Sequence, residues 1–276
     1  MKTIFRCILI LLDVEIWCAC VYSQETKLPP YPKKNLIDPQ VVAHVSKETT
    51  GYSYQYTVTN GTNASQDIDM FVIELRANVI KHSTARNWDV GPYNYDTIKV
   101  MIWDSYTPAT LVHPTEIVSG YGILSSGLPS IQRSWLSSYE KIPSREGQYD
   151  PASATIFATS LTRITLGPVI LREPFAPTTF LDTLISYKHQ ALALKWIDNG
   201  GVANSLDQKL ENARRKLESG DSATARNILE AFVNEVEAQK DKHLTSEAYA
   251  LLKFNAEYLI DRLPSPGKPE KFKEKK

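Results

Sequence analysis

The hydrophobic pattern of the chain changes from a period of two to a helical period. In residues 51–60, aromatic and β-branched residues alternate with polar ones, so that one face carries Tyr52, Tyr54, Tyr56 and Val58. This alternation is typical of a half-buried β-strand. A turn-forming segment, NGTNAS, then leads to a second apolar-rich segment, QDIDMFVIEL. We therefore predict that these two segments form a β-hairpin.

Further short strands are predicted before residue 177. They cover segments 97–103, 155–158 and 163–171. Turn residues separate the strands, among them Gly91–Pro92, Ser125–Ser126–Gly127 and Gly167–Pro168. The polar segment 137–153 is predicted to be a loop. Short strands with frequent turns favour an antiparallel β-sandwich over residues 40–177.

The distribution of proline predicts a second domain. Prolines are frequent up to Pro177, and none occurs in residues 178–263. Proline removes a backbone donor and interrupts helices, so its absence marks a helical region. Apolar residues there recur at helical spacing, as in Leu206, Leu210, Ala213 and Leu217.

Capping and stop signals divide this region into four helices. The predicted starts are the pairs Thr179–Asp182 and Ser205–Gln208, then Ser222 and Thr245. The predicted stops are Gly200–Gly201, Gly220 and Pro264. Short connections make neighbouring helices antiparallel. The predicted fold class is α+β in two separate domains, an antiparallel β-sandwich followed by a small antiparallel helical bundle over residues 178–263.

The N-terminal residues resemble a targeting signal. Lys2 and an apolar run from Ile4 to Leu12 fit a secretory signal peptide over residues 1–23. Lipidation at Cys20 and a buried N-terminal segment are the alternatives. A linker rich in proline and lysine, residues 24–39, follows. The basic tail, residues 264–276, is predicted to be disordered, and no later segment is apolar enough to span a membrane.

Charge and cysteine content narrow the class of protein. Lys plus Arg and Asp plus Glu both number 31. This balance argues against nucleic acid as a partner, because such binding needs an uncompensated basic face. All three cysteines precede residue 21. A form cleaved after the signal peptide therefore has no thiolate metal site, disulfide or cysteine nucleophile.

No motif for catalysis or cofactor binding is found. The five histidines are far apart in sequence, and there is no GxSxG, GxGxxG or phosphate-binding loop. We therefore assign no catalytic residue, no metal ligand and no cofactor. Asp67 and Asp69 share one strand face, where they form either a calcium site with turn carbonyls or, more simply, a solvated face.

Aromatic residues gather between positions 88 and 106. Trp88, Tyr93, Tyr95 and Trp103 could stack on sugar rings if they are exposed. The alternative is that these rings fill the core of the sandwich. We take the four residues as the candidate ligand-binding site.

The C-terminal region resembles a known domain family. The segments GVANSLDQKL, ARRKLESGD, ARNILEAFVNEVEAQ and LTSEAYALLKFNAEYLIDRL resemble the FIMAH domain over Gly201–Leu263. The resemblance implies an exported bacterial protein with a helical accessory or interaction module. It carries no catalytic residues.

Two functions from different classes remain. The first is an exported, non-enzymatic binding protein whose sandwich recognises an extracellular polysaccharide or surface protein. A structural scaffold without a small ligand is a variant of this function. The second is a secreted hydrolase, such as a glycosidase, with carboxylates of the sandwich in a cleft, drawn from Asp89, Asp96, Asp104 and Glu116.

Overall fold

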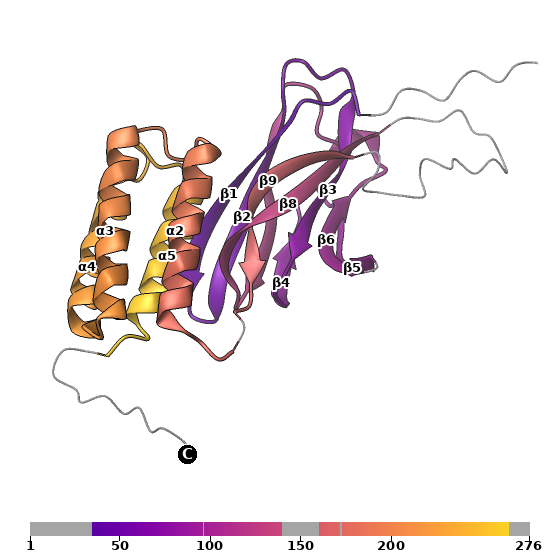
Figure 1. The fold of residues 1–276 in the computed structure, drawn as a ribbon. Helices are drawn as coiled ribbons and strands as arrows, with labels where there is room; N and C mark the ends of the chain where they lie inside the picture. The colour runs from indigo at the N-terminus through magenta and orange to yellow at the C-terminus, as the bar shows by residue number, and fades with distance from the viewer. Residues whose placement is uncertain (1–34, 96, 140–159, 172, 265–276) are drawn as a thin grey trace, which may run out of the picture. The chain divides into compact units, whose positions relative to one another are not determined.

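The computed structural model describes residues 35–95, 97–139, 160–171 and 173–264. Several predicted segments lie outside these residues, namely the signal peptide, strand 155–158, most of the linker, most of loop 137–153 and most of the basic tail. In the described part, strands between Pro39 and Val169 precede helices between Pro177 and Ile260 (Figure 1). The predicted order of β-sandwich and helical bundle is confirmed.

The described strands form two antiparallel sheets. The first has the order β1-β2-β7-β4, built from β1 (Pro39–Glu48), β2 (Gly51–Asn60), β7 (Ile117–Ser125) and β4 (Val79–Ser83). The second has the order β5-β6-β3-β8-β9, built from β5 (Asp89–Tyr95), β6 (Ile98–Asp104), β3 (Asp67–Leu75), β8 (Leu128–Tyr139) and β9 (Leu161–Val169). A short 3₁₀ helix, η1, covers Pro108–Thr110.

Aromatic rings fill the space between the two sheets. Tyr54 and Tyr56 of β2 are fully buried, as their alternation with polar residues predicts. Phe71 of β3 stacks on Trp103 of β6 with 5.2 Å between ring centroids, and it meets Tyr56 of the other sheet edge-on at 5.6 Å. Such ring pairs contribute about 0.5–1.5 kcal/mol each beyond burial. These contacts hold the two sheets together.

The predicted hairpin over residues 51–75 is wrong. β2 pairs with β1 and β7, whereas β3 pairs with β6 and β8 in the other sheet. Asn60 is buried where the chain leaves β2, and its side-chain amide donates to the carbonyls of Gln66 and Val112. The same side chain accepts from the backbone N–H of Asp38. The turn-forming segment is therefore a crossover between sheets, and β1 is the hairpin partner of β2.

Two predicted turns also lie inside strands. Gly91–Pro92 belongs to β5, and Gly167–Pro168 belongs to β9. Both are the edge strands of the second sheet, where a missing backbone donor is tolerated. The turn predicted at Ser125–Gly127 does separate β7 from β8.

The helices are α2 (Pro177–Ala193), α3 (Gly200–Glu218), α4 (Ser222–Gln239) and α5 (Ser246–Ile260). The starts predicted for the last two are confirmed. The Asp221 carboxylate accepts from the N–H of Thr224, and the Thr245 hydroxyl accepts from the N–H of Ala248. Gly220 has a φ of +80° just after α3, which is the conformation expected of a helix-ending glycine.

The starts predicted for the first two helices are wrong, and so is the end predicted for the first. α2 begins at Pro177, where the fixed φ of proline suits the first helical position. Asn199 caps α3, because its side-chain oxygen accepts from the N–H groups of Gly201 and Val202. Gly200–Gly201 therefore begins a helix, and Ser205 lies within it and donates to Glu235.

Helix α5 packs against the sandwich through its polar residues. The Glu247 carboxylate accepts from the backbone N–H of Ala43 in β1 at 2.8 Å, and the Ser246 hydroxyl donates to the carbonyl of Ala43 at 2.9 Å. Further along the helix, the Asn255 amide donates to the carbonyl of Pro129 in β8 at 2.9 Å. Glu247 and Asn255 are both buried. The two bonds to Ala43 satisfy backbone groups of β1, an edge strand, which would otherwise be open to pairing.

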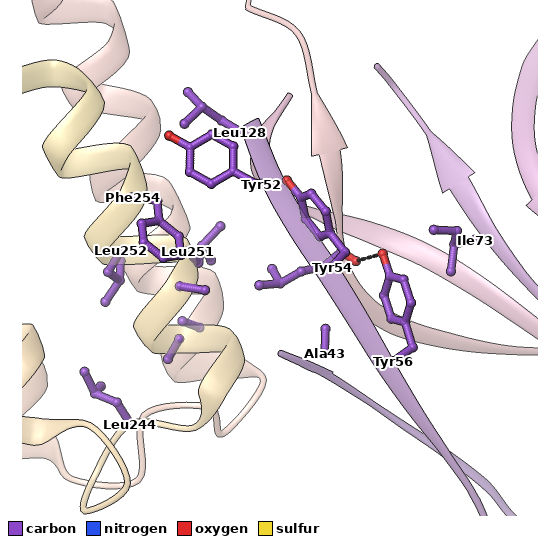
Figure 2. Close-up of a cluster of buried hydrophobic side chains, with 14 of the residues drawn as sticks. Ala43, Tyr52, Tyr54, Tyr56, Ile73, Leu128, Leu244, Leu251, Leu252 and Phe254 are labelled. Atoms are coloured by element: carbon purple, nitrogen blue, oxygen red, sulfur yellow. Dashed lines mark hydrogen bonds between the residues drawn. The ribbon is translucent and has the colours of Figure 1, made fainter. Parts of the chain in front are cut away.

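Apolar contacts reinforce the same junction. The Tyr52 and Phe254 rings lie 5.4 Å apart, and Figure 2 shows Leu251 and Phe254 of α5 beside Tyr52 and Tyr54 of β2. Buried side chains of the sandwich and of the helices form one continuous cluster. The two regions that differ in sequence pattern therefore share a hydrophobic core.

Candidate functional site

The structure divides the four predicted ligand-binding rings into two pairs. Trp103 is fully buried and Trp88 is 2% exposed. Each indole N–H donates to a backbone carbonyl, that of Ser83 for Trp103 and that of Thr110 for Trp88. Both rings also contact Tyr121 inside the sandwich. Neither tryptophan can stack on an external sugar, so the prediction is wrong for these two residues.

Tyr93 and Tyr95 instead lie on the outer face of the second sheet. Both belong to β5, two residues apart, and therefore point to the same side of the strand. Their partners across the ladder are Val100 and Ile98 of β6. Val100 belongs to a small outer cluster against which Tyr95 and Ile98 pack.

This outer cluster gives the face a rigid base. Its buried members are Val72, Val100, Ile102 and Trp135. Tyr95 is half-buried against them, whereas Tyr93 is 50% exposed. The Tyr93 ring also lies over Gly91. A Cβ atom at position 91 would lie only 3.5 Å from this ring. A flat ring is thus presented to solvent on a packed surface.

Tyr106 and Asp104 complete this face. Tyr106 follows β6, is 73% exposed, and donates a hydrogen bond to the carboxylate of Asp104. Burial raises the pKa of Asp104, the Tyr106 hydrogen bond lowers it in part, and the Asp89 carboxylate raises it further. Asp89 and Asp104 are direct partners in the β5–β6 ladder. We call Tyr93, Tyr95, Tyr106, Asp89 and Asp104 the tyrosine–aspartate face.

Electrostatic coupling confirms that these groups are neighbours. Burial raises the pKa of Tyr95, with further contributions from Tyr93 and Asp104. Burial and Asp104 likewise raise the pKa of Tyr106. Tyr106 belongs to the same aromatic run in the sequence but was not among the four predicted residues. Strand parity could not identify the exposed side, because β6 carries apolar residues on both faces.

The remaining acidic candidates are separated from this face or lie outside the described residues. The Glu116 carboxylate accepts from the Arg86 guanidinium at 2.9 Å, and this bond lowers its pKa. Asp96 is outside the described residues. Of the acids proposed for a hydrolase, the structure brings together Asp89 and Asp104 alone among those it describes.

Asp67 and Asp69 have protein partners. Asp67 Oδ1 lies 2.8 Å from His113 Nδ1, and Asp69 Oδ1 accepts from the Ser137 hydroxyl at 2.6 Å. Across the described ranges, no group of three or more His, Cys, Asp or Glu side chains could hold a metal ion. The two aspartates thus bind neighbouring side chains of the sandwich.

The helical part has two hollows on its surface. One, of about 410 Å³, lies on α3 and is lined by Asp207, Glu211 and Arg215 among others. The other, of about 370 Å³, lies between the α2–α3 and α4–α5 connections and includes Trp196. No described helix is long and apolar enough to cross a membrane.

Two solved structures are distantly similar to the chain. The Corynebacterium diphtheriae major pilin SpaA is 12% identical with a TM-score of 0.28, and the alignment covers 47% of this chain and 37% of the pilin chain. A chain of the CaDoc0917–CaCohA2 complex is 11% identical with a TM-score of 0.23, covering 48% of this chain and 100% of that one. TM-scores this low carry no argument about function.

The family comparison concerns the helical part. No curated protein matches the chain. A family model does match residues 189–261, which include the end of α2 and all of α3, α4 and α5. The sequence resemblance over Gly201–Leu263 is thereby confirmed. Residues 189–261 match the model of the FIMAH domain family.

Proposed function

We propose that the protein is an exported, non-enzymatic binding protein that recognises an extracellular polysaccharide through the tyrosine–aspartate face. The observation that carries the proposal is that Tyr93, Tyr95 and Asp104 lie on the same face of the β5–β6 ladder, with Tyr106 bonded to Asp104. Flat phenol rings pack against the apolar faces of sugars, and a carboxylate accepts from sugar hydroxyls.

The arrangement of the face supports an extended ligand. It lies on the β5–β6 edge of the second sheet, and the helices contact β1, β8 and β9 instead. Its rings rest on the outer cluster of Val72, Val100, Ile102 and Trp135. Binding would therefore need little ordering of side chains, which reduces its entropic cost. A protein partner on the bacterial surface would use the same exposed rings.

The FIMAH domain would act as an accessory module in this proposal. Its helix α5 contacts the sandwich at Ala43 and Pro129, so the domain would support the sandwich. Export is supported by the resemblance of residues 1–23 to a signal peptide. It is also supported by the match to a domain that we associate with secreted proteins.

One observation favours the hydrolase as a second candidate. Asp89 and Asp104 are direct ladder partners, and the pKa of Asp104 is raised mainly by burial. A carboxylic acid that keeps its proton to higher pH, beside a second carboxylate, is the arrangement that glycosidases use. In that case, the same face would both bind and cleave a glycan.

The test is a pull-down of the full chain from Gln24 on insoluble polysaccharides such as cellulose, chitin and xylan. We expect retention by at least one polymer, and a loss of at least tenfold in the Tyr93→Ala/Tyr106→Ala variant. Ile117→Ala, which removes a side chain 68% exposed on β7, is the control. Retention that is unchanged in the double variant would contradict the proposal. Retention by none of the polymers would leave a surface protein as the partner to seek.

The same proteins separate binding from cleavage. Release of reducing sugar by the wild-type chain, abolished by Asp104→Asn, would establish the hydrolase. Retention of polymer without any release would support the binding protein. Asp104→Asn keeps the size of the side chain and can still bond to Tyr106, so a loss of cleavage would report on the carboxylate itself.

A further inference from the structure

The helical part contains a second concave site, built from two connections that are far apart in sequence. The backbone N–H of Thr245 donates to the carbonyl of Trp196 at 2.9 Å, and the N–H of Asp198 donates to the carbonyl of His243 at 3.2 Å. Ile197 and Leu244, each 2% exposed, pair as a β-bridge between these bonds. The α2–α3 and α4–α5 connections are therefore fixed to each other.

A cavity of about 370 Å³ opens at this junction. Ligand pockets in proteins are commonly about 300–1,000 Å³, so the space suits one or two sugar rings. Its lining combines an aromatic ring with charged groups, namely Trp196, Lys195, Lys242, His243, Asp198 and Asp241. Trp196 is half-buried, so that part of its ring is fixed and part is accessible.

Some charged side chains of this lining are paired with each other, and others are not. Asp198 Oδ1 lies 2.7 Å from His243 Nδ1, which pairs the first acid with the imidazole. Lys195 and Lys242 are exposed, and neither is in an ion pair with a described residue. Lys195 and Lys242 are thus available to an anionic group in a cavity whose lining includes Trp196.

The backbone at Lys195 also favours a role for its side chain. Lys195 follows the end of α2 with a φ of +59°, a left-handed conformation that glycine adopts without strain. A lysine at such a position has a conformational cost that a glycine would not have. Its long side chain reaches into the lining of the cavity.

We propose that this pocket binds a uronic-acid residue of an acidic polysaccharide. The apolar face of the sugar would lie on Trp196, and its carboxylate would bind Lys195 and Lys242. Its hydroxyls would bond to His243 and to the carboxylate of Asp241. This site is independent of the tyrosine–aspartate face, since it lies in the FIMAH domain and the other in the sandwich.

Isothermal titration of the full chain with tetragalacturonate tests this proposal, with cellotetraose as the uncharged probe. We expect saturable binding of tetragalacturonate that is at least tenfold tighter than that of cellotetraose. Lys195→Ala/Lys242→Ala and Trp196→Ala should each weaken binding at least tenfold. The control Lys81→Ala removes an exposed lysine from β4 and should bind as the wild type does. Tyr93→Ala/Tyr106→Ala should also leave this affinity unchanged, which separates the two sites.

A further variant distinguishes loss of the binding site from loss of folding. Lys195→Gly removes the side chain and relieves the left-handed backbone, so we expect weaker binding with a melting temperature equal to or above that of the wild type. Absence of saturable binding by the wild type would overturn the proposal. Equal affinity for both probes, or wild-type affinity in the double lysine variant, would overturn it as well.

Discussion

Glu247, near the beginning of α5, accepts a hydrogen bond of 2.8 Å from the backbone N–H of Ala43 in the edge strand β1. The two residues are 204 positions apart, and both are buried. The neighbouring Ser246 hydroxyl binds the carbonyl of the same alanine. The helix therefore supplies the donor and acceptor that a further strand would otherwise provide, and the edge of the first sheet is closed.

Replacing Glu247 with alanine should destabilise the whole chain. The variant leaves the buried N–H of Ala43 without an acceptor, which costs about 1–3 kcal/mol of unfolding free energy. Urea denaturation followed by circular dichroism measures the change. Glu247→Gln keeps a side-chain oxygen and should recover part of the loss.

An exposed glutamate provides the matched control for this prediction. Glu218 forms a surface ion pair with Arg214, in which its side chain is 55% exposed. Pairs of this kind contribute about 0–1 kcal/mol, so Glu218→Ala should change stability less than Glu247→Ala. Equal effects of the two variants would show that the bond to Ala43 contributes no special stability.

The shared core also predicts that sandwich and helices unfold together. Tyr52 of β2 packs on Phe254 of α5, and Asn255 binds Pro129 of β8. In hydrogen exchange at increasing urea, peptides from β1 and from α5 should lose protection over the same range of concentration. Loss of protection in the helices while the strands stay protected would show two independent domains instead.

Features that depend on neighbouring residues could be predicted from the sequence. The alternation of Tyr52, Tyr54 and Tyr56 identified the buried face of β2, and the capping residues of α4 and α5 marked where those helices begin. These signals involve only a few neighbouring residues, so they can be recognised in the sequence without knowledge of the fold. The change in proline content likewise separated strands from helices.

Features that depend on contacts between distant residues could not be predicted from the sequence. A turn signal at NGTNAS cannot show that the chain crosses to the other sheet, because the bonds of Asn60 that fix it reach Val112 and Asp38. The burial of Trp103 depends on which side of β6 faces the first sheet, and the burial of Trp88 depends on its contacts with Tyr121 and Thr110. Asp89 and Asp104 meet only because β5 pairs with β6 at the edge of the second sheet.

Alkaline pH should weaken the junction of helix and sheet at Tyr52. Burial first, then the carboxylates of Glu257 and Asp261, raises the pKa of Tyr52 from 10.0 to about 12. In the unfolded chain, tyrosine loses its proton near pH 10, so folding opposes deprotonation and stability falls as pH rises from 10 to 12. A difference of two pKa units corresponds to at most about 3 kcal/mol.

The Tyr52→Phe variant measures this contribution. It keeps the ring against Phe254 and removes the ionisable hydroxyl, so its unfolding free energy should fall less than that of the wild type between pH 10 and 12. Tyr93→Phe, on the outer face of the second sheet and away from the helices, is the control. Identical pH profiles for wild type and Tyr52→Phe would contradict the prediction.

Alanine substitution should destabilise the protein strongly at a buried aromatic residue and only slightly at an exposed one. Trp103 is fully buried and contacts Phe71, Tyr56 and Tyr121, so Trp103→Ala should cost about 3–5 kcal/mol of stability. Tyr93 is half exposed, so Tyr93→Ala should change stability by less than about 1 kcal/mol. Thermal and urea unfolding of the two variants give both values.

Polysaccharide retention by the same two variants then separates a core residue from a binding residue. Trp103→Ala protein that is still folded at low temperature should bind polymer as the wild type does, because its ring lies between the sheets. Tyr93→Ala should be fully folded and bind less. Weaker retention by folded Trp103→Ala with unchanged retention by Tyr93→Ala would reverse the assignment, and would place the recognition surface somewhere other than on β5 and β6.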